Sequence, residues 1–355
     1  MKVLVPTLIT ETILVDTSAG ALIDASPTEI AYPPWVAGAK YLVGQRYAYD
    51  GNTYECVSRH QRRTTTPDLD TRFWKLFVAG VDHAEWVSAA AYTTGNVVFY
   101  SVTHRVYQAL TSHSGVSTTP DLDPTNWLDI GPTNPWAMFD QSTGSRTSAT
   151  SPLTFTLQPG IVTAIAFLGL VGASSVLVEM YDGFDLIYSH TEDVADTALI
   201  EDWYEYFFSE VVPTQDFVLD DMPPYANATI EVTVTGASTV GIGNCAVGNL
   251  VTIGPINYGA QVGIIDYSRK ETDDFGTTAI VERTYARKID ANIMIENTRL
   301  DYVYQKLAAL RATPAVWFDE SDYQSLILFG FYRDWSVVIP YPENSLVSIS
   351  LEGLA

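Results

Sequence analysis

The residues of this chain that could do chemistry are first of all its carboxylates. Asp68 and Asp70 flank a leucine in one turn, and Asp121 and Asp123 do the same further along the chain. A glycosidase needs two carboxyl groups, but the fold sets the distance between them, so the sequence does not exclude a pair. An enzyme rarely needs the same site twice so close together. The duplication therefore favours a structural role in a turn.

Histidine, cysteine and glycine patterns give no catalytic signature. No two histidines have the i, i+4 spacing of a helical zinc site, and no Cys-x-x-Cys occurs. A Gly-x-Ser-x-Gly elbow is missing, and the glycines at 241 and 243 lack the third glycine of a dinucleotide fingerprint. The sequence thus predicts no cofactor, no metal site and no enzyme. The five histidines are His60, His83, His104, His113 and His190.

A group of mixed charge follows the apolar run at residues 263–265. It contains Asp266, Arg269, Lys270 and Asp273, together with Asp274. Two interpretations stay open: a solvated turn between strands, or a patch of salt bridges to another subunit. We take the first four residues as candidate assembly contacts.

Composition restricts the partners. The 355 residues include 19 Lys or Arg and 42 Asp or Glu, for a net charge of −23. Such acidity favours solubility and repels phosphate backbones, so we expect no nucleic-acid partner. Two cysteines make no disulfide framework. The start of the chain lacks the apolar core of a signal peptide, and no apolar run reaches 18 residues, so we expect synthesis in the cytoplasm and no membrane anchor.

A tandem repeat organises the first part of the chain. Trp35, Tyr41, Gly44 and Tyr49 recur 51 residues later as Trp86, Tyr92, Gly95 and Tyr100. The offset then becomes 53, which pairs Tyr54 with Tyr107, Pro67 with Pro120 and Trp74 with Trp127. A length change between two aromatic runs is typical of a duplicated β-hairpin whose turn has grown.

Aromatic residues must supply most of the core of so small a unit. We predict that core to be Trp35, Tyr41, Tyr54 and Trp74, with their equivalents in the second copy. Some aromatic residues of the repeats are also candidates for contacts to a glycan or a partner. The candidates are Tyr49, Tyr100, Trp74 and Trp127.

Each repeat resembles the small chitin-binding modules of bacterial chitinases. The shared pattern is W-x5-Y-x2-G, an aromatic run, Y-x-A or Y-x-C, and a closing Trp. The resemblance implies a carbohydrate-binding module for host cell-surface polysaccharide. That family usually places exposed aromatics after Y-x-A, whereas this chain has Leu110 and Val57 there.

The rest of the chain is predicted to be mainly β and multi-domain. We expect an N-terminal arm at 1–33, repeats at 34–80 and 81–133, a β-sandwich at 134–237 and an α+β domain at 238–355. We interpret residues 1–33 as an extended arm or an extra strand on a neighbour, with the hypothesis that its partner belongs to another subunit. One helix, capped by Asn297, should present Leu300, Val303, Leu307 and Leu310 to an antiparallel sheet. The aromatic run at 203–207 is either core or an exposed binding patch.

Phrases in the second half resemble a family of tail proteins from tailed bacteriophages and prophages. They are YGAQVGIIDYSRKETDDFG, RATPAVWF, LFGFYRDWSVVIPYP and VSISLEGL, with PWAMFD and DWYEYFF before them. The resemblance implies a virion component of the tail tip or baseplate that binds other tail proteins as a homo-oligomeric ring. A glycan-binding adhesin for host attachment is the alternative, and a polysaccharide hydrolase with accessory modules is a third.

Overall fold

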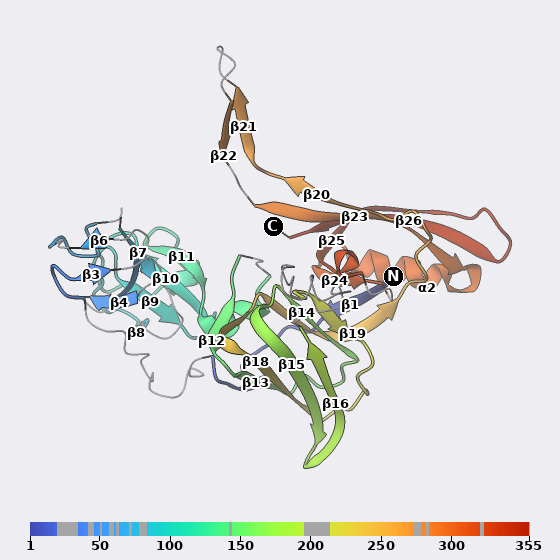
Figure 1. The fold of residues 1–355 in the computed structure, drawn as a ribbon, viewed down its shortest axis with the longest axis horizontal. Coiled ribbons are helices and arrows are strands. Elements are labelled where there is room, and N and C mark those ends of the chain that lie inside the picture. Colours follow the sequence, from blue (N-terminus) through green and yellow to red (C-terminus); the bar gives the residue numbers. More distant parts are fainter. Residues whose placement is uncertain are drawn as a thin grey trace, which may run out of the picture. The chain divides into compact units, whose positions relative to one another are not determined.

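The computed structural model describes residues 1–19, 35–41, 46–49, 52–56, 60–61, 64–70, 73–77, 84–141, 144–194, 214–272, 278–281, 284–319 and 323–354. The chain forms two compact units, which are described separately: residues 17–137, and residues 1–16 together with 138–355. Strands dominate both (Figure 1). The predicted mainly β, multi-domain fold class is confirmed.

The first repeat is built on a three-stranded antiparallel sheet in the order β4-β5-β7. Strands β4 (Arg46–Tyr49) and β5 (Asn52–Cys56) form a hairpin, and β7 (Trp74–Phe77) pairs with the other edge of β5. A second pair joins β3 (Lys40–Tyr41) to β6 (His60–Gln61).

The second repeat has the same three antiparallel strands and adds a fourth, β8 (Ala84–Glu85), which pairs in parallel with β9 (Val97–Tyr100). Its order is β11-β10-β9-β8, with β10 (Arg105–Ala109) and β11 (Trp127–Pro132). The turn between β9 and β10 spans residues 101–104, whereas β4 and β5 are separated only by residues 50–51. The two extra residues therefore lie in the hairpin turn, as the change of offset predicted. A short 3-10 turn, η1 (Pro120–Leu122), precedes β11.

The larger unit contains a nine-stranded sheet in the order β17-β14-β19-β1-β24-β25-β26-β23-β20. Strand β1 (Lys2–Pro6) lies inside it, antiparallel to β19 (Asn244–Thr252) on one edge and to β24 (Ala315–Phe318) on the other. The idea that the arm pairs with another subunit is therefore wrong for this strand, since its own chain occupies both edges. Residues 20–33 of the predicted arm lie outside the described part.

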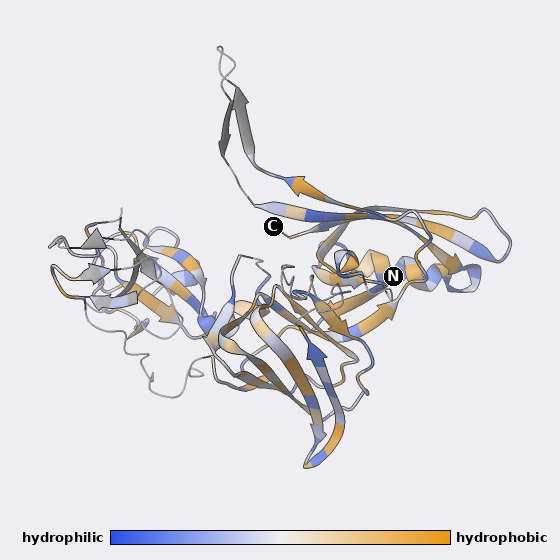
Figure 2. Ribbon diagram, in the orientation of Figure 1, coloured by the Kyte–Doolittle hydropathy of each residue, from blue (hydrophilic) through white to orange (hydrophobic). Residues whose placement is uncertain are grey.

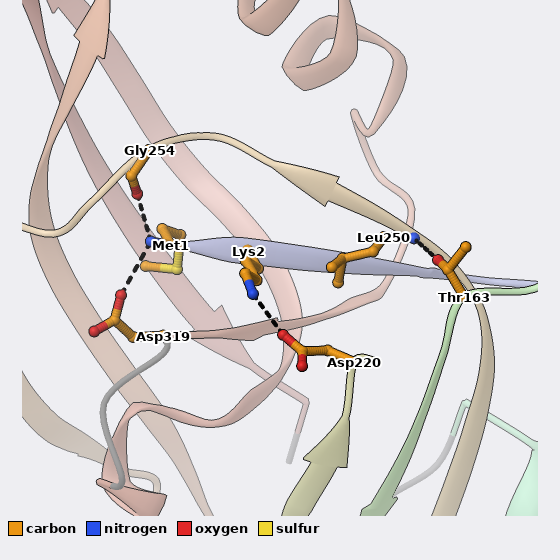
Figure 3. Close-up of polar contacts among 7 residues, drawn as sticks. All are labelled: Met1, Lys2, Thr163, Asp220, Leu250, Gly254 and Asp319. Carbon is orange, nitrogen blue, oxygen red and sulfur yellow. Dashed lines mark hydrogen bonds and ion pairs between the residues drawn. The ribbon is translucent and has the colours of Figure 1, made fainter. Parts of the chain in front are cut away.

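Polar contacts hold β1 in place (Figure 3). The Met1 amine donates to the Gly254 carbonyl at 2.5 Å and pairs with Asp319 at 3.0 Å. Lys2 Nζ lies 2.6 Å from Asp220 Oδ2, and the neighbouring strand is held where the Leu250 amide donates to Thr163 Oγ1 at 2.9 Å. Side chains of β1 enter two cores, because successive residues of a strand point to opposite faces.

The C-terminal part carries the predicted helix, α2 (Leu300–Ala309), after the 3-10 turn η3 (Asn297–Arg299). Val303, Leu307 and Leu310 are buried in the core that the sheet strands β23 (Tyr285–Glu296), β25 (Leu328–Val338) and β26 (Asn344–Gly353) supply. The predicted cap was wrong. Asn297 makes no cap; its amide donates instead to the carbonyls of Tyr341 and Pro342 at 3.0 and 2.8 Å.

A six-stranded sheet completes this unit in the order β16-β15-β18-β13-β2. Its strands are β2 (Leu14–Thr17), β13 (Leu153–Leu157), β15 (Val171–Asp182), β16 (Asp185–Asp193) and β18 (Thr229–Ile242), with β12 (Thr147–Thr150) paired to the end of β18. Figure 2 shows both hydrophobic and hydrophilic residues in these strands. Burial alternates along β13 and along the second half of β15, as expected where one face of a sheet is buried.

Strand β18 connects the two sheets. The chain leaves β18 at Ile242, turns at Gly243 and enters β19 of the nine-stranded sheet. The expected boundary after residue 237 falls inside β18. Strands β14 (Ala164–Leu168) and β17 (Phe217–Leu219), on the sandwich side of that boundary, also belong to the nine-stranded sheet. All five residues of β14 are buried, as for a strand covered on both faces.

Candidate functional site

The closing tryptophans of the repeats are core residues. Trp74 and Trp127 are only 2% and 3% exposed, and each packs in a cluster with the buried tyrosine of its hairpin. The prediction that these two tryptophans contact a glycan or a partner is therefore wrong for the folded repeat, because a buried ring offers no face to a ligand. The equivalent tyrosines Tyr41 and Tyr92 lie 4.8 and 4.9 Å from these rings. Of the predicted core, Tyr41, Tyr54 and Tyr107 are buried as well, whereas Tyr92 is partly buried.

The outer aromatic pair is the same in both repeats. Tyr49 meets Trp35 edge-on with ring centroids 5.4 Å apart, and Tyr100 meets Trp86 at 5.7 Å. All four rings are half-buried. We expected Trp35 and Trp86 in the core, but they lie at its margin and share the surface with the two tyrosines. Leu110, at the position where the chitin-binding family has an aromatic, is 43% exposed. Val57 lies outside the described residues.

The paired aspartates act in turns. The backbone carbonyl of Asp70 accepts the amide of Trp74 at 3.1 Å, and that of Asp123 accepts the amide of Trp127 at 3.0 Å. The Asp123 carboxylate also accepts the Asn126 side chain at 2.7 Å. The same hydrogen bond in both copies places the closing Trp on its strand, which agrees with a structural role for the second aspartate of each turn.

The histidines are scattered. His104 stacks on Trp136 at 3.7 Å, His113 contacts the Thr111 carbonyl, and His190 lies 3.1 Å from Glu192. Within the described ranges, no group of three or more His, Cys, Asp or Glu could hold a metal ion. The side chain of His60 and the whole of His83 lie outside the description, as does the aromatic run at 203–207.

The mixed-charge segment continues an open edge of the large sheet. Strand β20 (Gln261–Asp266) pairs only with β23 among the described strands, and its Val262 and Ile264 are 47% and 64% exposed. Asp266 is exposed and accepts the Ser268 amide at 2.9 Å. Arg269 and Lys270 lie on β21 (Arg269–Thr272), which forms a hairpin with β22 (Thr278–Val281). Asp273 lies outside the described residues.

A cavity of about 250 Å³ lies in the larger unit, where the ends of β14, β17 and β19 face β23, β25 and β26. At its wall Arg287 Nη1 donates to Asp216 Oδ2 and to the Ile327 carbonyl, and the Gly169 amide donates to Asp216 Oδ1 at 2.8 Å. Asp216 and Asn244 are each 5% exposed. Sequence reasoning missed this site, because its charged partners are 71 residues apart and belong to no motif.

Comparison with models of protein families and with curated protein sequences gave no match. In the described part of the chain, no helix has the length and apolar character needed to cross a membrane.

Proposed function

We propose that this protein is a structural component of a bacteriophage tail tip or baseplate, assembling with copies of itself and with other tail proteins in the virion. One observation supports this most: among the described strands the large sheet ends in an edge strand, β20, which has two exposed apolar side chains and is followed by the hairpin β21–β22 (Figure 1). The proposal assigns the chain no reaction and no cofactor.

Edge strands usually carry devices against pairing with other chains, such as lysine, proline or a bulge. Strand β20 has none of these: it reads Gln-Val-Gly-Ile-Ile-Asp and pairs with β23 in continuous register. Such an edge is suited to a partner strand, because main-chain groups give affinity and alternate side chains give specificity. A repeated contact of this type in one direction produces a ring when the rotation closes.

The experiment is sedimentation of the full chain, together with electron microscopy of particles labelled with an antibody against it. We expect a defined oligomer that Ile264→Lys converts to monomer, because lysine on an edge opposes strand pairing. Ile339→Lys is the matched control: Ile339 is 62% exposed but lies after β25 and outside the edge strand. A chain that stays monomeric at high concentration and is missing from particles would refute the proposal.

A second candidate function is attachment to host polysaccharide through the repeats. The duplicated Trp35–Tyr49 and Trp86–Tyr100 pairs support it, since ring surfaces at the same place in two modules could hold one chain of sugars. Several copies in a ring would raise weak affinity by avidity. Retention on chitin and on host polysaccharide is the measurement. Loss of retention in Tyr49→Ala/Tyr100→Ala is expected, and no retention of the parent chain would reject this function.

A further inference from the structure

The cavity in the larger unit has the size and lining of a small ligand site. Its 250 Å³ is below the roughly 300 Å³ at which sites for drug-sized ligands begin. Its polar lining includes the buried Asp216 and Asn244 and the exposed Gln215. Its apolar and aromatic lining includes Leu328, Phe329 and the exposed ring of Tyr285.

Charge argues against an ionic ligand. Among the lining residues that the structure describes, the single cation, Arg287, is paired with the single anion, Asp216. Because the two charges balance, neither an anion nor a cation gains a net attraction. The pair is only partly buried, since the side chain of Asp216 is 7% exposed and that of Arg287 is 38% exposed. Arg287 lines the cavity, so its guanidinium can contact a ligand there while it holds Asp216.

The polar groups suit vicinal hydroxyls. Both described hydrogen bonds of the guanidinium come from Nη1, whereas a guanidinium has five N–H donors. Gln215 provides an amide donor and an acceptor, and a carboxylate has about four acceptor positions, of which two contacts are described at Asp216. A hydroxyl group both donates and accepts, so it can use each of these groups, and the apolar lining residues can contact the apolar face of a sugar ring.

We propose that this cavity binds a single neutral sugar residue. The site is distinct from the repeats and goes beyond the proposed structural role, because it would place a glycan contact in the unit that carries the large sheet. Tyr285 is the ring on which the sugar packs, and the Asp216–Arg287 pair with Gln215 holds its hydroxyls.

Ligand-observed NMR on the full chain tests this, using free glucose, galactose, N-acetylglucosamine and rhamnose, with glucuronate as the anionic probe. We expect at least one neutral sugar to bind in the millimolar range. Tyr285→Ala should weaken that binding about tenfold, which corresponds to about 1.4 kcal/mol, and Gln215→Ala should weaken it as well. Both residues are exposed, so the fold should persist. Tyr258→Ala, at a fully exposed tyrosine outside the cavity, is the matched control.

Three outcomes would overturn the inference: no neutral sugar binds, only glucuronate binds, or binding survives Tyr285→Ala and is lost in Tyr100→Ala, which would assign it to the repeats. Sedimentation of Tyr285→Ala separates this from the proposed function. A variant that assembles like the parent but loses the sugar supports a distinct site, whereas failure of the parent chain to assemble concerns the structural proposal alone.

Discussion

The carboxylate of Asp290 on β23 lies between two groups that stabilise its charged form. Hydrogen bonds from Lys288 and Ser350 lower its pKa below the ordinary value of 3.8, and Lys288 Nζ is 2.7 Å away. A lowered pKa means that the folded state gains stability above the unfolded pKa and loses it as the pH falls through the folded value. We therefore predict that Asp290→Asn removes part of the loss of stability below about pH 4, measured by urea unfolding across that range.

The size of this effect should be small, because both side chains are 38% exposed and solvent screens the pair. Lys288→Met provides the control, since it removes the larger cause of the shift in the Asp290 pKa. It should also reduce the fall in the free energy of unfolding below about pH 4. The same fall in the free energy of unfolding at acid pH in the parent chain and in Asp290→Asn would contradict the prediction.

Single residues differ in how far the sequence predicts them. Trp74 and Trp127 could be placed on equivalent strands from their spacing alone, because a duplicated small core must reuse its largest rings. The partial exposure of Trp35 and Trp86 could not be predicted, because it depends on how completely neighbouring side chains cover a ring. The Asp216–Arg287 pair was beyond prediction, since neither residue has a local pattern that indicates its partner.

Strands β15 and β18 bring two like charges together. Glu179 and Glu231 are directly opposite in the antiparallel register of the six-stranded sheet. Like charges in that position are destabilising, and opposite charges contribute about 0.2–1 kcal/mol. We predict that Glu231→Lys raises the free energy of unfolding of the larger unit by a few tenths of a kcal/mol up to about 1 kcal/mol. Denaturant unfolding measures it.

A double-mutant cycle isolates the pair from the general gain of a positive charge in an acidic protein. Glu179→Lys/Glu231→Lys restores two like charges, so its stability should fall below the sum of the two single changes. Additive values would show that the residues do not interact, and the register would then have no energetic consequence at this position.

Elements whose structure is set by near neighbours were predictable. The longer hairpin turn of the second repeat follows from a change of offset, and the buried face of α2 follows from a helical period. The position of β1 was not predictable, because its partners β19 and β24 lie about 250 to 315 residues away. Nor was the role of Asn297, whose amide binds the turn before β26.

At the scale of the molecule, strand β18 joins two regions that the sequence analysis assigns to separate domains. The glycine-rich segment at 236–248 looks like a linker, yet it spans the end of β18, a turn and half of β19. A Cβ at Gly243 would lie 2.9 Å from the Leu168 carbonyl, so glycine lets the two backbones approach closely there. Composition alone cannot distinguish such an approach from a linker, which explains why the two expected domains share a sheet.

Charge is distributed unevenly between the two units. Residues 147–268 contain fifteen Asp or Glu and no Lys or Arg. The larger unit as a whole has 31 acidic and 11 basic residues, whereas residues 17–137 have 11 and 8. Self-repulsion of this kind destabilises the compact state. The effect should be concentrated in the larger unit.

We therefore predict that salt raises the thermal midpoint of the larger unit. Raising sodium chloride from about 0.01 M to about 0.1 M shortens the Debye length from about 30 Å to about 10 Å, which screens the acidic residues from one another. Calorimetry of the full chain should show that the thermal midpoint of the larger unit rises by a few degrees. The midpoint of residues 17–137 should rise less, and this transition serves as the internal control. The prediction fails if the thermal midpoints of both transitions rise equally, or if that of the larger unit falls. Either result would mean that ion pairs of the larger unit, such as Lys2–Asp220, outweigh the repulsion.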